Sequence, residues 1–117
     1  MLDKVSDHLG KEFNSQPGKE DIRIVDLLTH QAGWPPDPTP MFWNETFGCP
    51  QYSNGVTPET LDCVDKAFNW VMLNQTLQLS PGVKYVYSDL SFMTVAWILG
   101  KIASEKSYIS KSDWCDK

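Results

Sequence analysis

The sequence has no long apolar run, little positive charge and no apolar segment at its start. Its longest uninterrupted apolar stretch is residues 95–99, whereas a helix that spans a bilayer needs about 20 such residues. Met1-Leu2-Asp3-Lys4 is followed by mainly polar sequence, unlike the apolar core of a signal peptide. We therefore expect neither a membrane span nor a signal peptide in these residues.

Basic residues are outnumbered and scattered. The chain has 10 Lys and Arg against 15 Asp and Glu, giving a formal net charge of -5 at pH 7. A nucleic-acid-binding surface normally gathers Lys and Arg into a patch or stripe, and no such stripe is present. We expect no nucleic-acid partner.

The cysteine pattern excludes the usual zinc sites. Cys49, Cys63 and Cys115 form no Cys-x-x-Cys pair, and the only histidines lie far upstream. We expect no metal and no other cofactor. Asn44 and Asn74 begin N-glycosylation patterns, and a candidate Cys49–Cys63 disulfide would agree with them in favouring a secreted or luminal location. A cytosolic location stays open.

With 117 residues, 41% of them hydrophobic, the chain can form one modest core, as a single domain or part of one. Spacing and turn residues predict mostly helices around a long irregular loop. In the second helix Leu27 and Leu28 should face the core and Asp26 the solvent. The expected elements are helical turns within 1–13, an extended entry into a helix over 22–30 with an end near Gly33, the aromatic loop 34–58, a helix over 57–75, a short strand over 83–87, an apolar helix over 90–102 and a polar tail over 103–117.

The segment from Ser80 to Ser91 organises the second half of the chain. Pro81-Gly82 indicates a turn, alternating apolar residues indicate a short strand, and Ser88 or Asp89 can cap the next helix. Taken alone, Tyr87 is an ordinary strand aromatic and the two residues after it an ordinary helix cap.

Residues 81–90 read Pro-Gly-x-x-Tyr-x-Tyr-Ser-Asp-Leu and precede an apolar helix. This run resembles the second active-site motif, Tyr-x-Asn, of the serine β-lactamase and penicillin-binding family, closest to its esterase-like and class C-like branch. The resemblance implies a proton-transfer role for Tyr87 and places Asp89 where Asn is usual. An alternative alignment with a Ser-Asp-Asn motif fails, because Leu90 cannot hydrogen-bond as Asn does.

The string Ile-x-Ile-x-x-Leu-Leu-Thr-His-x-x-Gly over residues 22–33 resembles a second signature of that family, which precedes the loop bordering the substrate cleft. Its His30 is expected to be structural, and no Ser-His-Asp triad is predicted. By the same resemblance Trp34, Phe42 and Trp43 are candidate substrate-binding residues that shape an apolar acyl pocket. The alternative is that these aromatic residues only anchor the loop.

No serine of the chain has Lys three residues later, and no Lys-Thr-Gly or His-x-Gly motif follows Tyr87. The resemblance therefore implies the mainly helical middle part of an α/β (α+β) β-lactamase/transpeptidase-like domain, with the nucleophile helix expected before Met1. That domain would act on small ester or amide substrates. The competing hypothesis is a non-catalytic binding module or pseudoenzyme that uses the aromatic loop. As part of a β-lactamase/transpeptidase-like domain, the chain would lack the sheet strands that cover the apolar helix over 90–102, so this helix is expected to be partly uncovered and to favour self-association.

Overall fold

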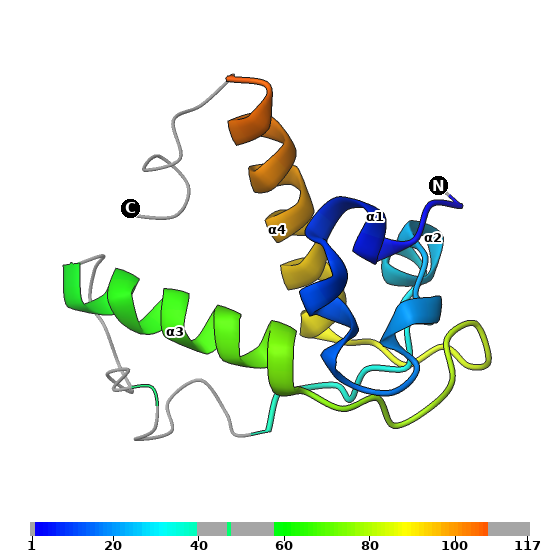
Figure 1. Ribbon diagram of the computed structural model, residues 1–117. Helices are drawn as coiled ribbons and strands as arrows, with labels where there is room; N and C mark the ends of the chain where they lie inside the picture. The colour runs from blue at the N-terminus through cyan, green and yellow to red at the C-terminus, as the bar shows by residue number, and fades with distance from the viewer. Residues whose placement is uncertain (1, 40–46, 48–57, 108–117) are drawn as a thin grey trace.

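The computed structural model describes residues 2–39, 47 and 58–107, excluding the side chains of residues 58–62, 64, 65 and 67. The described residues are mainly helical, as the sequence predicts. They form α1 (Val5–Leu9), the 3₁₀ helices η1 (Lys11–Ser15) and η2 (Lys19–Asp21), α2 (Ile24–Leu28), α3 (Pro58–Asn74) and α4 (Asp89–Glu105). In Figure 1, α1 and α2 lie beside α4, while α3 extends away from this group and meets it at its C-terminal end.

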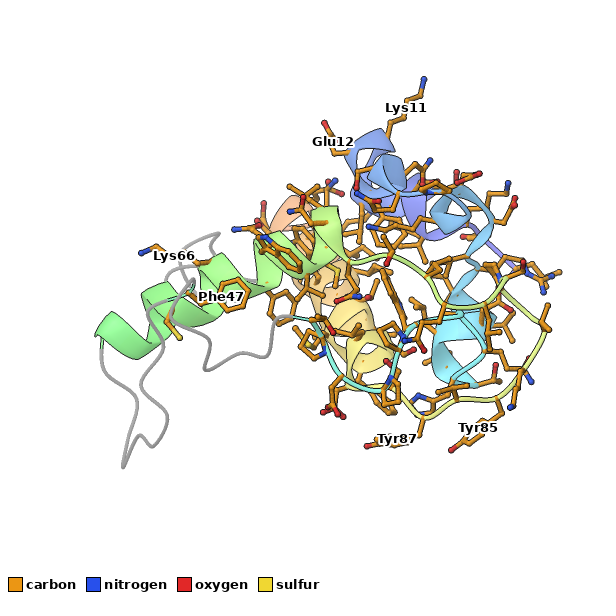
Figure 2. All side chains as sticks on the ribbon, turned by 90° about the horizontal axis from the view of Figure 1, so that it is seen from below. Lys11, Glu12, Phe47, Lys66, Tyr85 and Tyr87 are labelled. Carbon is orange, nitrogen blue, oxygen red and sulfur yellow. The ribbon has the colours of Figure 1, made fainter. Side chains whose placement is uncertain are left out.

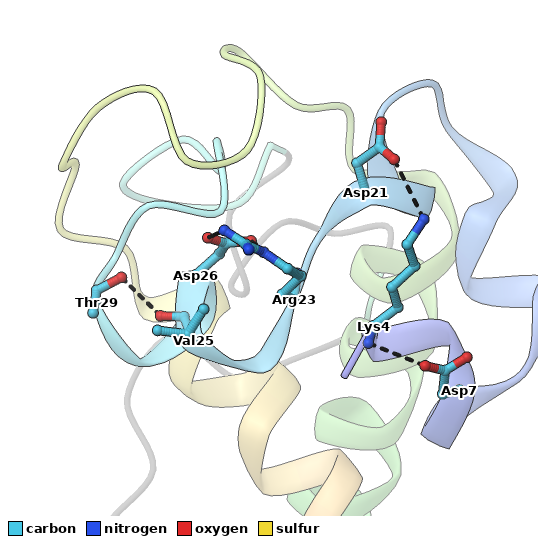
Figure 3. Close-up of polar contacts among 7 residues, drawn as sticks. All are labelled: Lys4, Asp7, Asp21, Arg23, Val25, Asp26 and Thr29. Atoms are coloured by element: carbon cyan, nitrogen blue, oxygen red, sulfur yellow. Dashed lines mark hydrogen bonds and ion pairs between the residues drawn. The ribbon is translucent and has the colours of Figure 1, made fainter. Parts of the chain in front are cut away.

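The N-terminal segment is held beside the start of α2 by backbone pairing. Lys4 and Arg23 form an isolated antiparallel bridge, with Val5 N–H donating to Ile22 O at 2.9 Å and Ile24 N–H donating to Asp3 O at 2.9 Å. A further contact between the two segments is the exposed ion pair of Lys4 with Asp21 (Figure 3). The expected extended entry into a helix after residue 22 is thus confirmed.

Asp26 is buried, contrary to the prediction that it faces solvent. It is 2% exposed, and its Oδ2 accepts the backbone N–H of Arg23 at 2.9 Å and the Arg23 guanidinium at 3.4 Å (Figure 3). A carboxylate in the third helical position satisfies a free N–H at the helix start, which explains the burial. Leu28, predicted to be in the core, is 42% exposed.

Two further predictions from the sequence, the end of α2 and the strand before α4, are wrong. Helix α2 ends at Leu28 rather than near Gly33, because His30 takes a left-handed backbone with φ 53°. The strand expected over residues 83–87 is absent, since the only β pairing among the described residues is that of Lys4 with Arg23. The helices predicted over 57–75 and 90–102 are both confirmed. No helix of the described part is long and apolar enough to cross a membrane.

The core forms where the N-terminal helices, α4 and the C-terminal end of α3 meet. Its buried apolar residues are Val5, Phe13, Ile22, Leu27, Ala32, Trp34, Val71, Met72, Leu90 and Ile98.

Lys19 is fully buried at the edge of this core. Its ammonium lies 4.5 Å from the ring centre of Phe13 and 5.4 Å from that of Trp34, and it donates to the carbonyl of Met72 in the last turn of α3. Ser15 donates to the next carbonyl, that of Leu73. Two side chains from the N-terminal region therefore occupy carbonyls that the end of an α-helix leaves without partners.

Burial lowers the pKa of Lys19 from 10.5 to about 8. Between these two pH values the unfolded chain binds more protons than the folded one, so the free energy of unfolding should rise with pH. Over this window Lys19 should add about 1 kcal/mol to the free energy of unfolding for each pH unit. The increase should be complete above pH 10.5. Denaturant unfolding of the wild type and Lys19→Met from pH 7 to 11 would measure it as a difference.

Lys11 is exposed (Figure 2) and provides the control. Lys11→Met should keep the wild-type pH dependence, whereas Lys19→Met should lose the extra slope. Parallel curves for wild type and Lys19→Met would contradict the buried, proton-releasing lysine.

One face of α4 is apolar and exposed. Leu90, Thr94 and Ile98 are buried, whereas Phe92 is 52% and Leu99 61% exposed, with exposed Ala96 between them. Residues at this spacing share one side of a helix, so the exposed side chains form a continuous stripe.

We expect this stripe to make the 117-residue chain self-associate. Sedimentation over a concentration series should give masses above that of the monomer for the wild type, and Phe92→Glu/Leu99→Glu should shift the distribution toward monomer. Leu2→Glu is the control, because Leu2 is 73% exposed and lies outside α4. A monodisperse wild-type monomer at every concentration would rule out this use of the stripe.

Candidate functional site

The segment around Tyr87 is held in place by an irregular segment far away in the sequence. Residues 78–89 lie along residues 30–36, and every backbone bond recorded between them runs from an N–H of the later segment to a carbonyl of the earlier one. These bonds are Gln78 and Leu79 to Gly33 O, at 2.8 and 3.3 Å, Gly82 to Gln31 O at 2.7 Å, Val86 to His30 O at 2.9 Å and Asp89 to Pro36 O at 3.2 Å.

Several residues of the earlier segment have no N–H left to donate. The N–H groups of His30 and Gln31 already donate to Leu27 O and Asp26 O. Pro35 and Pro36 have no N–H and can only accept. Gly33 has φ 91°, and a Cβ built there would lie 2.0 Å from the carbonyl oxygen of Leu79. Only glycine combines this backbone with this contact, so Gly33 lets the two segments touch.

Ser88 connects this pair of segments to α4. It is 1% exposed, its Oγ donates to Pro35 O at 2.6 Å, and the same Oγ accepts the N–H of Leu90 at 3.2 Å. The N–H of Ser88 donates to Nδ1 of His30 at 3.1 Å. Ser88 is therefore the N-cap of α4, as the sequence allowed, and also a buried link to residues 30–36.

Tyr87 and Asp89 flank this buried serine and are both exposed. Tyr87 is 57% exposed, and its ring centre lies 4.6 Å from that of His30. Tyr85 is 59% exposed and also contacts His30, edge-on at 5.8 Å. Figure 2 shows both tyrosines pointing outward from the same side of the molecule. Asp89 lies in the first turn of α4, where the helix dipole favours negative charge.

Of the three predicted substrate-binding residues, the structure describes only Trp34, and it is buried. Trp34 is 2% exposed and packs in the core, edge-on against Phe13 at 6.4 Å. Phe42 and Trp43 lie outside the described residues. Phe47, from the same aromatic loop, is 3% exposed and contacts Trp70 at 5.9 Å. For Trp34 and Phe47 the geometry favours the alternative in which the aromatic residues anchor the loop.

The structure describes some of the residues of the two glycosylation patterns and the candidate disulfide, on which the expected secreted or luminal location depends. Asn74 ends α3 and is exposed, with its Nδ2 donating to Trp70 O at 3.1 Å. Cys63 is 5% exposed and disulfide-bonded. Asn44, Cys49 and Cys115 lie outside the described residues, so glycosylation and the pairing of Cys49 with Cys63 stay predictions.

A family model described as Beta-lactamase matches residues 1–110 of the chain. The chain belongs to the Beta-lactamase family. This match confirms the family expected from the two motifs. The mainly helical structure of the described residues is consistent with part of the fold of that family.

Curated relatives cover much of this chain with a small part of their own length. A protein of Salmonella paratyphi B named "Putative D-alanyl-D-alanine carboxypeptidase" is 33% identical over 88 residues, which are 74% of this chain and 18% of that protein. A protein of the same name from Salmonella agona is 32% identical over 99 residues, 80% of this chain and 20% of its own. The chain thus spans about a fifth of these relatives. No solved structure gives a significant match.

Sequence reasoning located the motif of this β-lactamase relative but missed what supports it. His30 was expected to be structural, yet nothing in the sequence indicates that it contacts Tyr87 and Ser88. Ser88 lies 58 residues after His30 in the chain. The Pro35-Pro36 pair was the available signal that this segment accepts hydrogen bonds from another part of the chain, because adjacent prolines present carbonyls without competing N–H groups.

Ser88→Ala should destabilise the chain by about 2 kcal/mol, since it removes a helix cap and leaves the Pro35 carbonyl without its donor. Ser91→Ala is the matched control. Ser91 is also 1% exposed, but its Oγ has no hydrogen-bond partner among the described residues, so its loss should cost less than about 0.5 kcal/mol. Chemical denaturation of both variants tests this, and equal losses would contradict the linking role of Ser88.

Proposed function

We propose that this chain supplies one wall of the active site of a serine hydrolase that transfers acyl groups from small ester or amide substrates. Family membership supports the hydrolase class. The observation that carries the proposal is the contrast between Tyr87, 57% exposed, and Ser88 beside it, 1% exposed and fully bonded. A reactive phenol must be accessible to the substrate, and the backbone that carries it must be held in a fixed position.

In this proposal Tyr87 carries the proton. The ionised Tyr87 oxygen takes the proton of a serine hydroxyl while the serine oxygen bonds to the substrate carbonyl carbon. The proton then passes to the leaving alcohol or amine as the bond between that group and the carbonyl carbon breaks. A phenol serves as a base near neutral pH only when a nearby cation favours its ionised form. In the family the Lys of Ser-x-x-Lys is the natural cation, and we expect both residues of that motif to come from outside these 117 residues.

Asp89 is proposed as the second residue of the wall. It is exposed in the first turn of α4, two residues after Tyr87. An ionised carboxylate only accepts hydrogen bonds, whereas the Asn usual at this position both donates and accepts. Asp89 therefore suits a donor, such as the nucleophile's Lys or an N–H of the substrate.

The 117-residue chain should not be labelled by a fluorophosphonate or a penicillin probe, because no serine in it has the activating Lys. In a longer product of the same gene that contains Ser-x-x-Lys, Tyr87→Phe should lower kcat by about 10²-fold, the scale of a lost general acid–base group. KM should change less.

Tyr85→Phe is the control for that comparison, because Tyr85 has nearly the same exposure at 59% and also contacts His30. It should retain turnover within about three-fold. Labelling of the 117-residue chain, or an unchanged kcat for Tyr87→Phe, would refute the assignment. If no product of the gene contains Ser-x-x-Lys, a non-catalytic binding module becomes the better account.

A further inference from the structure

We infer that His30 is a positioning residue for Tyr87, because its ring lies against the phenol ring while one of its nitrogens holds the next peptide group. The inference rests on the proposed function, in which the direction of the phenol matters. It assigns to His30 no contact with substrate.

The backbone of His30 is the first element of this arrangement. Its φ of 53° is left-handed, a conformation that His, Asn and Asp adopt more readily than most residues. The turn places the His30 carbonyl where it accepts Val86 N–H at 2.9 Å. The histidine is thereby fixed to the chain just before Tyr87.

The ring nitrogen is the second element. Nδ1 accepts Ser88 N–H at 3.1 Å, so Nδ1 carries no proton and the neutral ring has its proton on Nε2. This bond fixes the rotation of the imidazole. Together with the Val86 bond, it means that His30 accepts the backbone N–H groups of the two residues that flank Tyr87.

The ring face is the third element. The imidazole and the Tyr87 ring are 4.6 Å apart and tilted by 34°, while Tyr85 and Phe92 meet the imidazole nearly edge-on, at 83° and 73°. His30 is 8% exposed, yet each of the three rings around it is more than half exposed. The imidazole thus fills the space under Tyr87 and leaves the phenol only outward directions.

These contacts argue against proton transfer by His30 itself. Its Nδ1 is occupied by a backbone donor, and the ring is nearly covered by aromatic side chains. A general base must reach the proton that it takes. Positioning is the role that the geometry leaves for this residue.

Two variants that accept a left-handed backbone separate the contributions of ring and nitrogen. His30→Asn puts a side-chain oxygen in the place of Nδ1 and removes the ring, and His30→Gly removes both. Amide hydrogen exchange of Ser88 reports the nitrogen, with Val86 as the internal control, because its acceptor is the His30 backbone. Three-bond couplings to the Tyr87 Cγ report whether its χ1 stays in one rotamer.

In the 117-residue chain, His30→Gly should speed Ser88 exchange about five-fold, whereas His30→Asn should keep it near the wild-type rate, with Val86 unchanged in both. Tyr87 should occupy one rotamer in the wild type and several in both variants. An unchanged Tyr87 rotamer in His30→Asn, or unchanged Ser88 exchange in His30→Gly, would overturn the inference.

The activity arm uses the longer Ser-x-x-Lys product. His30→Asn should lower kcat about ten-fold and leave KM close to the wild-type value, since only the direction of the phenol changes. A wild-type kcat for His30→Asn, with a Tyr87→Phe loss intact, would also overturn the positioning role. If Tyr87→Phe loses nothing, the proposed function fails, and the exchange and coupling results still decide whether His30 orients Tyr87.

Discussion

Two segments without regular structure, residues 30–36 and 78–89, are bound to each other by hydrogen bonds. Carbonyls of residues 30–36 accept backbone N–H groups of residues 78–89, and the Pro35 carbonyl accepts the Ser88 hydroxyl. Buried peptide groups are costly when unpaired, so the buried residues of these segments, among them Gly33 and Ser88, depend on this pairing. The start of α4, the direction of Tyr87 and the exposure of Asp89 all follow from it, because Ser88 belongs to the paired segment and to the helix cap at once.

The sequence predicted the parts that depend on local chemistry. The α3 and α4 helices follow from apolar spacing and capping residues, and the family follows from the Tyr87 and His30 motifs. It failed where a distant contact decides the outcome. The alternation of Val83, Tyr85 and Tyr87 indicated a strand. In the structure this segment donates hydrogen bonds to separate carbonyls of residues 30–36 instead of pairing with a strand. Asp26 was expected to be exposed because the core face of the helix was assigned to residues such as Leu27 and Leu28, but it is buried and accepts the backbone N–H of Arg23.

The attachment of α3 shows a similar dependence on residues that are far apart in the chain. Its last turn contributes Val71 and Met72 to the core, and Lys19 and Ser15 bind carbonyls at its end. A lysine is an unusual choice for a fully buried position, because its charge must give up water. Aromatic faces and a helix C-terminus both attract a cation, which makes this one of the few buried places where an ammonium has suitable neighbours.

The contact between Ser88 and Pro35 joins residues 53 positions apart, and the connecting chain includes the whole of the aromatic loop. Closing such a long connection costs conformational entropy that grows only with the logarithm of its length, roughly 0.6 kcal/mol for each doubling. A change of several residues between positions 40 and 57 therefore alters the cost of bringing Ser88 to Pro35 very little. Relatives that differ in the length of that loop would therefore keep the bonds that hold Tyr87 in place at nearly the same entropic cost.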